Sequence, residues 1–139
     1  MNIQKFTQKS LEAIQNAQSI ALENQNSQIE QEHLMLSLLE QEDSLIKELL
    51  KKMGITNGFE ETLKNKINMM PKMSGGARPN DSIYVSRDVD VTLNDAEKIA
   101  TKMKDEYVSV EHIMLSLFDN ANGQIKDLFR TYGINKNEF

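Results

Sequence analysis

The octapeptide Glu32-His33-Leu34-Met35-Leu36-Ser37-Leu38-Leu39 has a second copy in this chain, Glu111-His112-Ile113-Met114-Leu115-Ser116-Leu117-Phe118. The offset between the two copies is 79 residues. Applied without a gap to residues 6–60 and 85–139, the same offset gives 14 identical positions out of 55. Chance would give about 3 or 4 matches, so the chain is an internal repeat and its architecture follows from what one repeat can form.

Each repeat has the pattern of short helices. Positions 11, 14, 17, 20 and 21 are apolar, which is the spacing of one helical face, and Thr7 can cap the start of that helix. Further helices are predicted over about 30–40, from Asp43 or Ser44 to Gly54, and over about 57–70. Strand alternation is ambiguous only around Tyr84-Val85 and residues 89–91. The sequence therefore predicts an all-α protein.

The second repeat carries matching start and end signals at Ser86, Ser109 and Gly133. Between the repeats, residues 71–84 are rich in Gly and Pro and are predicted to be a loop, with Gly75-Gly76 favouring mobility. We expect one domain over residues 1–139, with repeat 1 over about 6–70 and repeat 2 over about 85–139, ending a few residues into its last helix. Two four-helix units related by a pseudo-two-fold axis, with about 7–8 helices in all, would share one core.

Composition excludes several classes of function. The chain has 16 Lys+Arg against 21 Asp+Glu, evenly spread, so it has no basic face for nucleic acid. It has no Cys, which excludes thiolate metal sites, and its two His could not form a multi-His metal site without carboxylates. No apolar run approaches the roughly 20 residues of a membrane span, and no signal-peptide core is visible. We expect a cytoplasmic protein that does not bind membranes.

The histidines and some methionines can be read in two ways. His33 and His112 lack partners at metal-ligand spacing, so we expect each to bond to the backbone of its helix. Met69, Met70 and Met73 flank the predicted loop, where they either fill gaps at a helix end or offer flexible apolar surface for varied partners.

The offset also pairs polar residues. Thr7 maps to Ser86 and Glu32 maps to Glu111, so each repeat offers a hydroxyl at one helix start and a carboxylate in the first turn of another helix. Helix amides with the hydroxyl could hold an anion while the carboxylate holds a cation, which would make two related polar pockets. The alternative is structural, because a helix dipole favours a carboxylate in the first turn.

The first helix of repeat 2 is unusually apolar at its start. Val85, Val89, Val91 and Leu93 cannot all face one core at helical spacing, so some are expected to be exposed and to form a groove. The alternative is that all four fill the seam between the repeats. On the groove hypothesis, we select Leu11, Val89, Val91 and Tyr107 as contributors.

The doubled Glu-His-Leu/Ile-x-Leu-x-Leu motif, with Ala-x-x-Ile-Ala upstream of each copy, resembles the N-terminal repeat domain of Clp-type AAA+ chaperones. Phe6-Thr7-Gln8-Lys9, the linker from Met70 to Gly76, and Tyr84-Val85-Ser86-Arg87-Asp88 are more similar to the ClpB-type disaggregases than to the ClpC-type unfoldases of that family. The resemblance covers essentially the whole chain.

This resemblance implies a module that captures exposed apolar segments of unfolded or aggregated polypeptides in a shallow groove. The positions matching the family's groove and its edge are Thr7, Leu93, Asp105 and Glu111. The module would serve an ATPase ring, expected to be a hexamer. No ATPase motif is visible here, so the chain is not expected to be an enzyme or to need a cofactor of its own. ATP and Mg would belong to the ATPase modules of the longer protein.

Two other functions compete. The ClpC-type likeness implies an adaptor- or phosphoarginine-docking module, with Thr7, Glu32, Ser86 and Glu111 in the paired pockets. A small enzyme using Glu32 and Glu111 is disfavoured, because symmetric carboxylates give no reason for the split pKa values that an acid–base pair needs.

Overall fold

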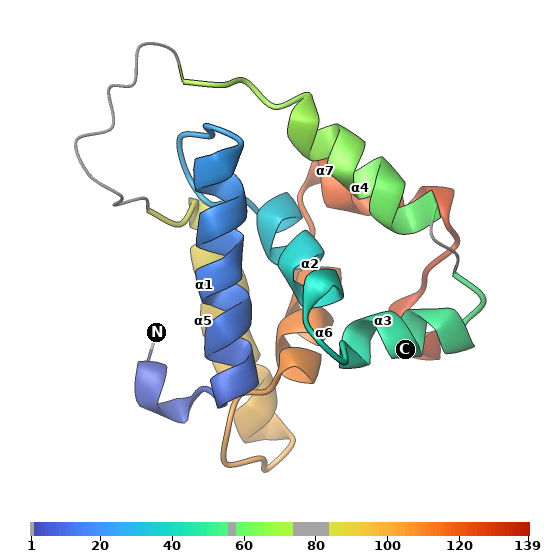
Figure 1. Ribbon diagram of the computed structural model, residues 1–139. Coiled ribbons are helices and arrows are strands. Elements are labelled where there is room, and N and C mark those ends of the chain that lie inside the picture. Colours follow the sequence, from blue (N-terminus) through green and yellow to red (C-terminus); the bar gives the residue numbers. More distant parts are fainter. Residues whose placement is uncertain (1, 56–57, 74–83) are drawn as a thin grey trace.

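The computed structural model describes residues 2–55, 58–73 and 84–139. Within these residues the fold is all-helical, which confirms the predicted class (Figure 1). Two isolated parallel bridges are the only extended pairing in the described ranges. The elements are η1 (Ile3–Lys5), α1 (Gln8–Glu23), α2 (Gln31–Glu40), α3 (Leu45–Lys52), α4 (Gly58–Asn68), α5 (Arg87–Lys102), α6 (Val110–Asn120), α7 (Gly123–Thr131) and η2 (Lys136–Glu138).

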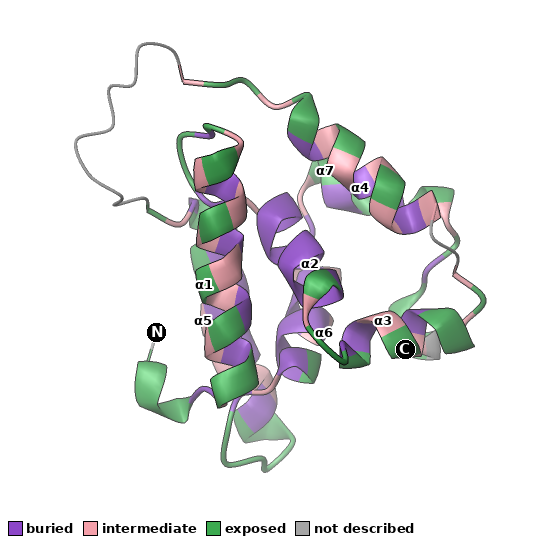
Figure 2. Cartoon of the chain, in the orientation of Figure 1, coloured by how far each residue is buried: buried purple, intermediate pink, exposed green. Residues whose placement is uncertain are grey.

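The helices reproduce the repeat. Adding 79 to the bounds of α1 gives those of α5, while α2 corresponds to α6 and α3 to α7. The short η2 lies where the counterpart of α4 would begin. In each repeat the first helix packs on the second, α1 on α2 and α5 on α6. The duplicated motif thus forms the central helix of each unit, and Figure 2 shows α2 as the most continuously buried helix.

Where α1 packs on α2, the core combines small residues of α1 with large residues of α2. Ala13, Ala17 and Ala21 are fully buried on α1, at helical spacing, and leave room for α2 to approach closely. Every residue from 31 to 39 is buried, including Met35. Hydrophobic burial on this scale is the main stabilising term of such a bundle.

The two repeats pair crosswise through their extended segments. Phe6 bridges Val108, with the Thr7 N–H donating to the Val108 carbonyl at 3.0 Å. Its counterpart under the offset, the Ile29–Val85 bridge, has the Ser86 N–H donating to the Ile29 carbonyl at 2.9 Å. The first helix of each repeat therefore starts beside the second helix of the other repeat. The ambiguous Tyr84-Val85 segment is the extended partner in one of these bridges.

The later helices also cross over. Helix α3 of repeat 1 contacts α6 of repeat 2, and α4 of repeat 1 contacts α7 of repeat 2. The Tyr132 hydroxyl of α7's C-cap donates to the Gly58 carbonyl at 2.8 Å, and the Phe59 and Tyr132 rings meet edge to face with centroids 5.6 Å apart. Neither repeat closes a core by itself, as expected for units that share one interior.

The predicted helix ends are confirmed where they are described. Thr7 and Ser86 accept the N–H of Ser10 and Val89, at 3.1 and 3.2 Å. Gly54 and Gly133 end α3 and α7 with φ of +84° and +65°, a conformation that favours glycine. The predicted start of the fourth helix at about residue 57 lies outside the described residues.

Both histidines bond to the backbone, as predicted, and each does so at the start of its helix. His33 Nδ1 accepts the Glu30 N–H at 2.8 Å, and His112 Nδ1 accepts the Ser109 N–H at 2.9 Å. Because Nδ1 is an acceptor in both rings, the proton lies on Nε2. The Nε2–H of His33 donates to Asn26 Oδ1 at 2.8 Å. Burial lowers the pKa of His33 from 6.5 to about 4.

Gln31 is the polar joint between the repeats. Its fully buried amide donates to Thr92 Oγ1 at 3.0 Å and to the Asn120 carbonyl at 2.8 Å. Its carbonyl oxygen accepts the Asn122 N–H at 2.8 Å. One side chain of α2 thus connects α5, the end of α6 and the start of α7.

Replacing Gln31 by leucine is expected to lower the free energy of unfolding by about 2–3 kcal/mol, because it removes three hydrogen bonds that join three elements. Urea denaturation followed by circular dichroism measures the loss. Gln15→Leu, on the exposed face of α1, is the control and is expected to change stability by less than about 0.5 kcal/mol. Equal midpoints for wild type and Gln31→Leu would contradict this account.

Acidification is expected to destabilise the fold through His33. Between the unfolded pKa of 6.5 and the folded value of about 4, the unfolded chain binds more protons, so stability falls as pH falls. This group alone contributes a loss of about 2 kcal/mol between pH 7 and pH 5. In His33→Asn the amide oxygen can take the place of Nδ1 but does not titrate. Its stability is expected to vary less with pH than that of wild type, and parallel profiles in urea denaturation would rule the effect out.

Candidate functional site

The Phe6–Val108 bridge gathers five of the predicted site residues at one end of the molecule. Thr7 and Leu11 belong to the start of α1, which bonds to Val108. Asp105 and Tyr107 lie in the α5–α6 loop just before Val108, and Glu111 lies in the first turn of α6. We call this surface, made of Thr7, Leu11, Asp105, Tyr107 and Glu111, the α1–α6 end.

The α1–α6 end combines exposed apolar and acidic groups. Tyr107 is 52% exposed, the Asp105 side chain is 47% exposed, and Glu111 is exposed. Thr7 and Leu11 are half-buried. Ile3 of η1 and Met103, which caps α5, add exposed apolar side chains in the adjoining segments. Sequence periodicity did not select Ile3 and Met103, because neither belongs to a helical face.

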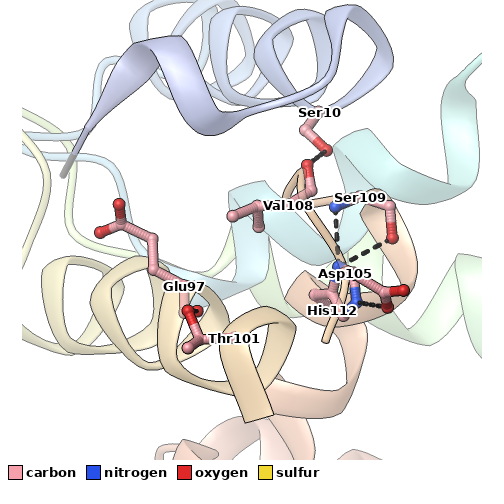
Figure 3. Close-up of polar contacts among 7 residues, drawn as sticks. All are labelled: Ser10, Glu97, Thr101, Asp105, Val108, Ser109 and His112. Atoms are coloured by element: carbon pink, nitrogen blue, oxygen red, sulfur yellow. Dashed lines mark hydrogen bonds and ion pairs between the residues drawn. The ribbon is translucent and has the colours of Figure 1, made fainter. Parts of the chain in front are cut away.

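Hydroxyl groups hold the helix starts together at this end. The Thr7 hydroxyl accepts the Ser10 N–H and donates to Ser10 Oγ at 2.9 Å. The buried Ser10 Oγ donates in turn to the Val108 carbonyl at 2.9 Å, as Figure 3 shows. The Thr7 hydroxyl is therefore already engaged in capping, which limits its capacity to hold an anion.

A histidine–carboxylate pair lies in the same region (Figure 3). His112 Nε2–H donates to Asp105 Oδ2 at 2.8 Å, while Nδ1 accepts the Ser109 N–H and lies 3.1 Å from Ser109 Oγ. The pair links the loop to the first turn of α6. Sequence reasoning did not place His112 in the site, because its contact with Asp105 is created by the fold.

The apolar residues at the start of α5 separate into core and surface. Val89 and Leu93 are 1% and 2% exposed, whereas Val91 is 38% exposed. Residues four apart share a helical face, and a residue two positions on lies about 200° around the helix. The structure therefore places Val89 and Leu93 in the core, away from any surface groove. Because Val91 is exposed, the alternative that Val85, Val89, Val91 and Leu93 all fill the seam between the repeats is also wrong.

The two predicted polar pockets cross between the repeats and differ in character. Thr7 lies beside the start of α6, which carries Glu111, and Ser86 lies beside the start of α2, which carries Glu32. Glu111 is exposed, but Glu32 is 5% exposed and accepts Asn122 Nδ2–H at 2.9 Å. Burial raises the pKa of Glu32, an effect that the Asn122 hydrogen bond opposes.

Glu32 borders a cavity of about 360 Å³ next to the predicted linker. Its lining is polar on the α1–α2 side and includes Met70 and Pro71 on the other side. The full set of lining residues is Asn26, Ser27, Gln28, Glu30, Glu32, Met70 and Pro71. Met69 is 84% exposed, while Met70 and Met73 are half-buried. The predicted mobile residues Gly75-Gly76 lie outside the described residues.

The described ranges contain neither a metal-binding cluster nor a membrane-spanning helix. No three His, Asp or Glu side chains there are grouped to hold a metal ion. None of the helices in those ranges combines the length and apolarity needed to cross a bilayer.

Comparison with known proteins identifies the fold. A family model described as the Clp repeat (R) N-terminal domain matches residues 5–132. The chaperone protein ClpB of Clostridium tetani is 38% identical over 140 residues, which cover 100% of this chain and 16% of that protein. The crystal structure of the Hsp104 N-terminal domain from Candida albicans has a TM-score of 0.83 at 28% identity, over 96% of this chain and 85% of that one.

A more distant structure shares the fold alone. The ClpV N-domain, solved in complex with a VipB peptide, has a TM-score of 0.73 at 20% identity, over 97% of this chain and 82% of that one. The chain spans about one sixth of the length of the ClpB relative that it matches. Since the family model covers most of the sequence and the relative covers all of it, this chain belongs to the Clp repeat (R) N-terminal domain family.

Proposed function

We propose that the chain is the N-terminal substrate-binding module of a cytoplasmic, ATP-dependent disaggregase, and that it captures exposed apolar segments of unfolded or aggregated polypeptides at the α1–α6 end. The observation that supports this most is the exposure of Tyr107 between two acidic positions, Asp105 and Glu111, on one bridged surface. The ClpB relative and the Hsp104 domain agree with a chaperone role.

Apolar contact at this end would be weak and reversible. The exposed side chains of Ile3, Met103 and Tyr107 belong to the segments that meet there. A ligand that buried about 150 Å² of apolar surface would gain about 4 kcal/mol before its loss of freedom is counted. Weak binding suits a module that must release each segment onward. Met103 can adapt to different sequences because its side chain is flexible and polarizable.

The acidic residues would select among apolar segments. Asp105 and Glu111 place negative charge beside Tyr107, so segments that also carry Lys or Arg are favoured. This contribution is screened by salt, since both carboxylates face solvent.

ATP hydrolysis and threading would be carried out by other parts of the longer protein. The chain corresponds to 16% of its ClpB relative, and the matched family model describes an N-terminal domain. On this proposal, ATP and Mg bind elsewhere, in a hexameric ring. Capture here would raise the local concentration of substrate near that ring.

A second function, docking of an adaptor or of phosphoarginine, is supported by the cavity beside Glu32. A half-enclosed space of about 360 Å³ with one buried carboxylate could accept a guanidinium group. Against it, the hydroxyls of Thr7 and Ser86 already cap their own helices. Capture of apolar segments remains the better-supported proposal.

Replacing Tyr107 by serine is expected to weaken binding of a reduced and alkylated, apolar-rich protein by about threefold to tenfold, because a large aromatic contact is lost. Tyr84→Ser is the matched control, since Tyr84 is 83% exposed beside the other bridge. Both variants should keep the wild-type melting temperature. NMR titration is expected to shift amides of residues 3–11 and 103–111. Equal loss in both variants, or shifts confined to the surroundings of Glu32, would count against this site.

Free phosphoarginine titrated into the chain by calorimetry separates the two functions. The capture proposal expects no saturable heat. Saturable heat that disappears in Glu32→Gln, which preserves the hydrogen bond from Asn122, would instead promote the docking function. Glu111→Gln is the control at the exposed counterpart.

A further inference from the structure

The two repeats use the same histidine in different surroundings. In repeat 1, His33 is fully buried and its Nε2–H donates to Asn26, which is itself buried. In repeat 2, His112 is 4% exposed, but its partner is the half-exposed carboxylate of Asp105. The same backbone cap on Nδ1 is present in both. The difference therefore lies in the group that the histidine holds and in where that group points.

Asp105 has one carboxylate oxygen engaged and one available. Oδ2 accepts from His112 at 2.8 Å, and among the described residues Oδ1 has no hydrogen-bond partner. A carboxylate held in this way can accept a further hydrogen bond without losing its orientation. The buried Asn26 of repeat 1 makes no comparable group available to solvent.

The loop that carries Asp105 and Tyr107 is fixed at three points. At its start, Lys104 has φ of +62° and the Asp105 N–H donates to the Ala100 carbonyl at 2.9 Å. At its end, the Val108 N–H donates to the Lys5 carbonyl at 2.7 Å. Between these points the side chains of Asp105 and Tyr107 extend into solvent, and the third fixed point is the hydrogen bond from His112.

We propose that His112 is a positioning residue of the α1–α6 end: its Nε2–H holds Asp105 so that the free oxygen faces outward beside Tyr107 and accepts an N–H donor from a captured polypeptide segment. The donor is a main-chain amide or a Lys or Arg side chain of that segment. This inference rests on the proposed function. The exposed carboxylate of Asp105 explains why binding would use the α1–α6 end, although the backbone pairing is the same beside both bridges.

Two substitutions separate the two bonds of His112. In His112→Asn the amide oxygen can replace Nδ1 as acceptor for Ser109, but the side chain is too short to reach Asp105. In His112→Gln the longer amide can still donate to Asp105, but the cap is lost. His33→Asn is the matched control, because it breaks the corresponding bond to Asn26 in repeat 1.

Affinity for the reduced and alkylated protein and hydrogen exchange of the loop amides are measured on the 139-residue chain under conditions where all variants are folded. We expect His112→Asn to weaken binding about fivefold and to speed exchange at residues 105–107, as loss of one charge-assisted hydrogen bond implies. His112→Gln is expected to bind within about twofold of wild type, and His33→Asn to lower stability without changing affinity.

Each outcome bears on a different statement. If wild type binds and folded His112→Asn binds equally well, the positioning role is wrong while the proposed function stands. If His33→Asn weakens binding as much as His112→Asn, the effect is general destabilisation and the inference is overturned. If wild type does not bind at all, the proposed function fails. In that case the inference fails with it, and loop exchange in His112→Asn reports only whether His112 holds the Asp105 loop.

Discussion

The crosswise pairing of two short extended segments governs this structure. Each first helix enters through a bridge to the other repeat, Phe6 with Val108 and Val85 with Ile29, so the starts of four helices are fixed relative to one another. The central helices α2 and α6 then meet in a shared core, and α3 and α7 each pack across the boundary. Because the pairing uses backbone groups, it leaves the side chains beside it free to differ between the two ends.

Those side chains do differ, and this is where function is separated from fold. Beside the Ile29–Val85 bridge, Glu32 and Asn26 are buried, and Asn122, which caps α7, donates a hydrogen bond to the Glu32 carboxylate. At the other end Glu111 and Asp105 face solvent. Burial imposes a desolvation penalty on the ionised carboxylate and so raises the pKa of Glu32, whereas an exposed carboxylate is available to a ligand. The two repeats therefore share one backbone arrangement but present surfaces of different character.

The repeat offset predicted much of the fold but little of the candidate site. It predicted helix order and the caps at Thr7, Ser86, Gly54 and Gly133, since these depend on local chemistry. It could not indicate the crosswise pairing, because an offset does not say which copy a helix start faces. Helical spacing indicated that the apolar residues at the start of α5 could not all face one core, but it could not say which of them are exposed. Val89, selected by this spacing, and Leu93, selected by the family resemblance, are both buried. The role of Asp105 depends on a contact with His112 that only the fold creates.

The crosswise bridges arrange the two repeats as two subunits of a homodimer would be arranged. A single repeat would present two unpaired extended segments and an uncovered central helix, and a second copy would satisfy both by exchanging partners about a two-fold axis. Here the residues between the repeats join the two partners covalently. Association becomes intramolecular, with an effective concentration on the order of millimolar, so the stability of the shared core does not depend on protein concentration.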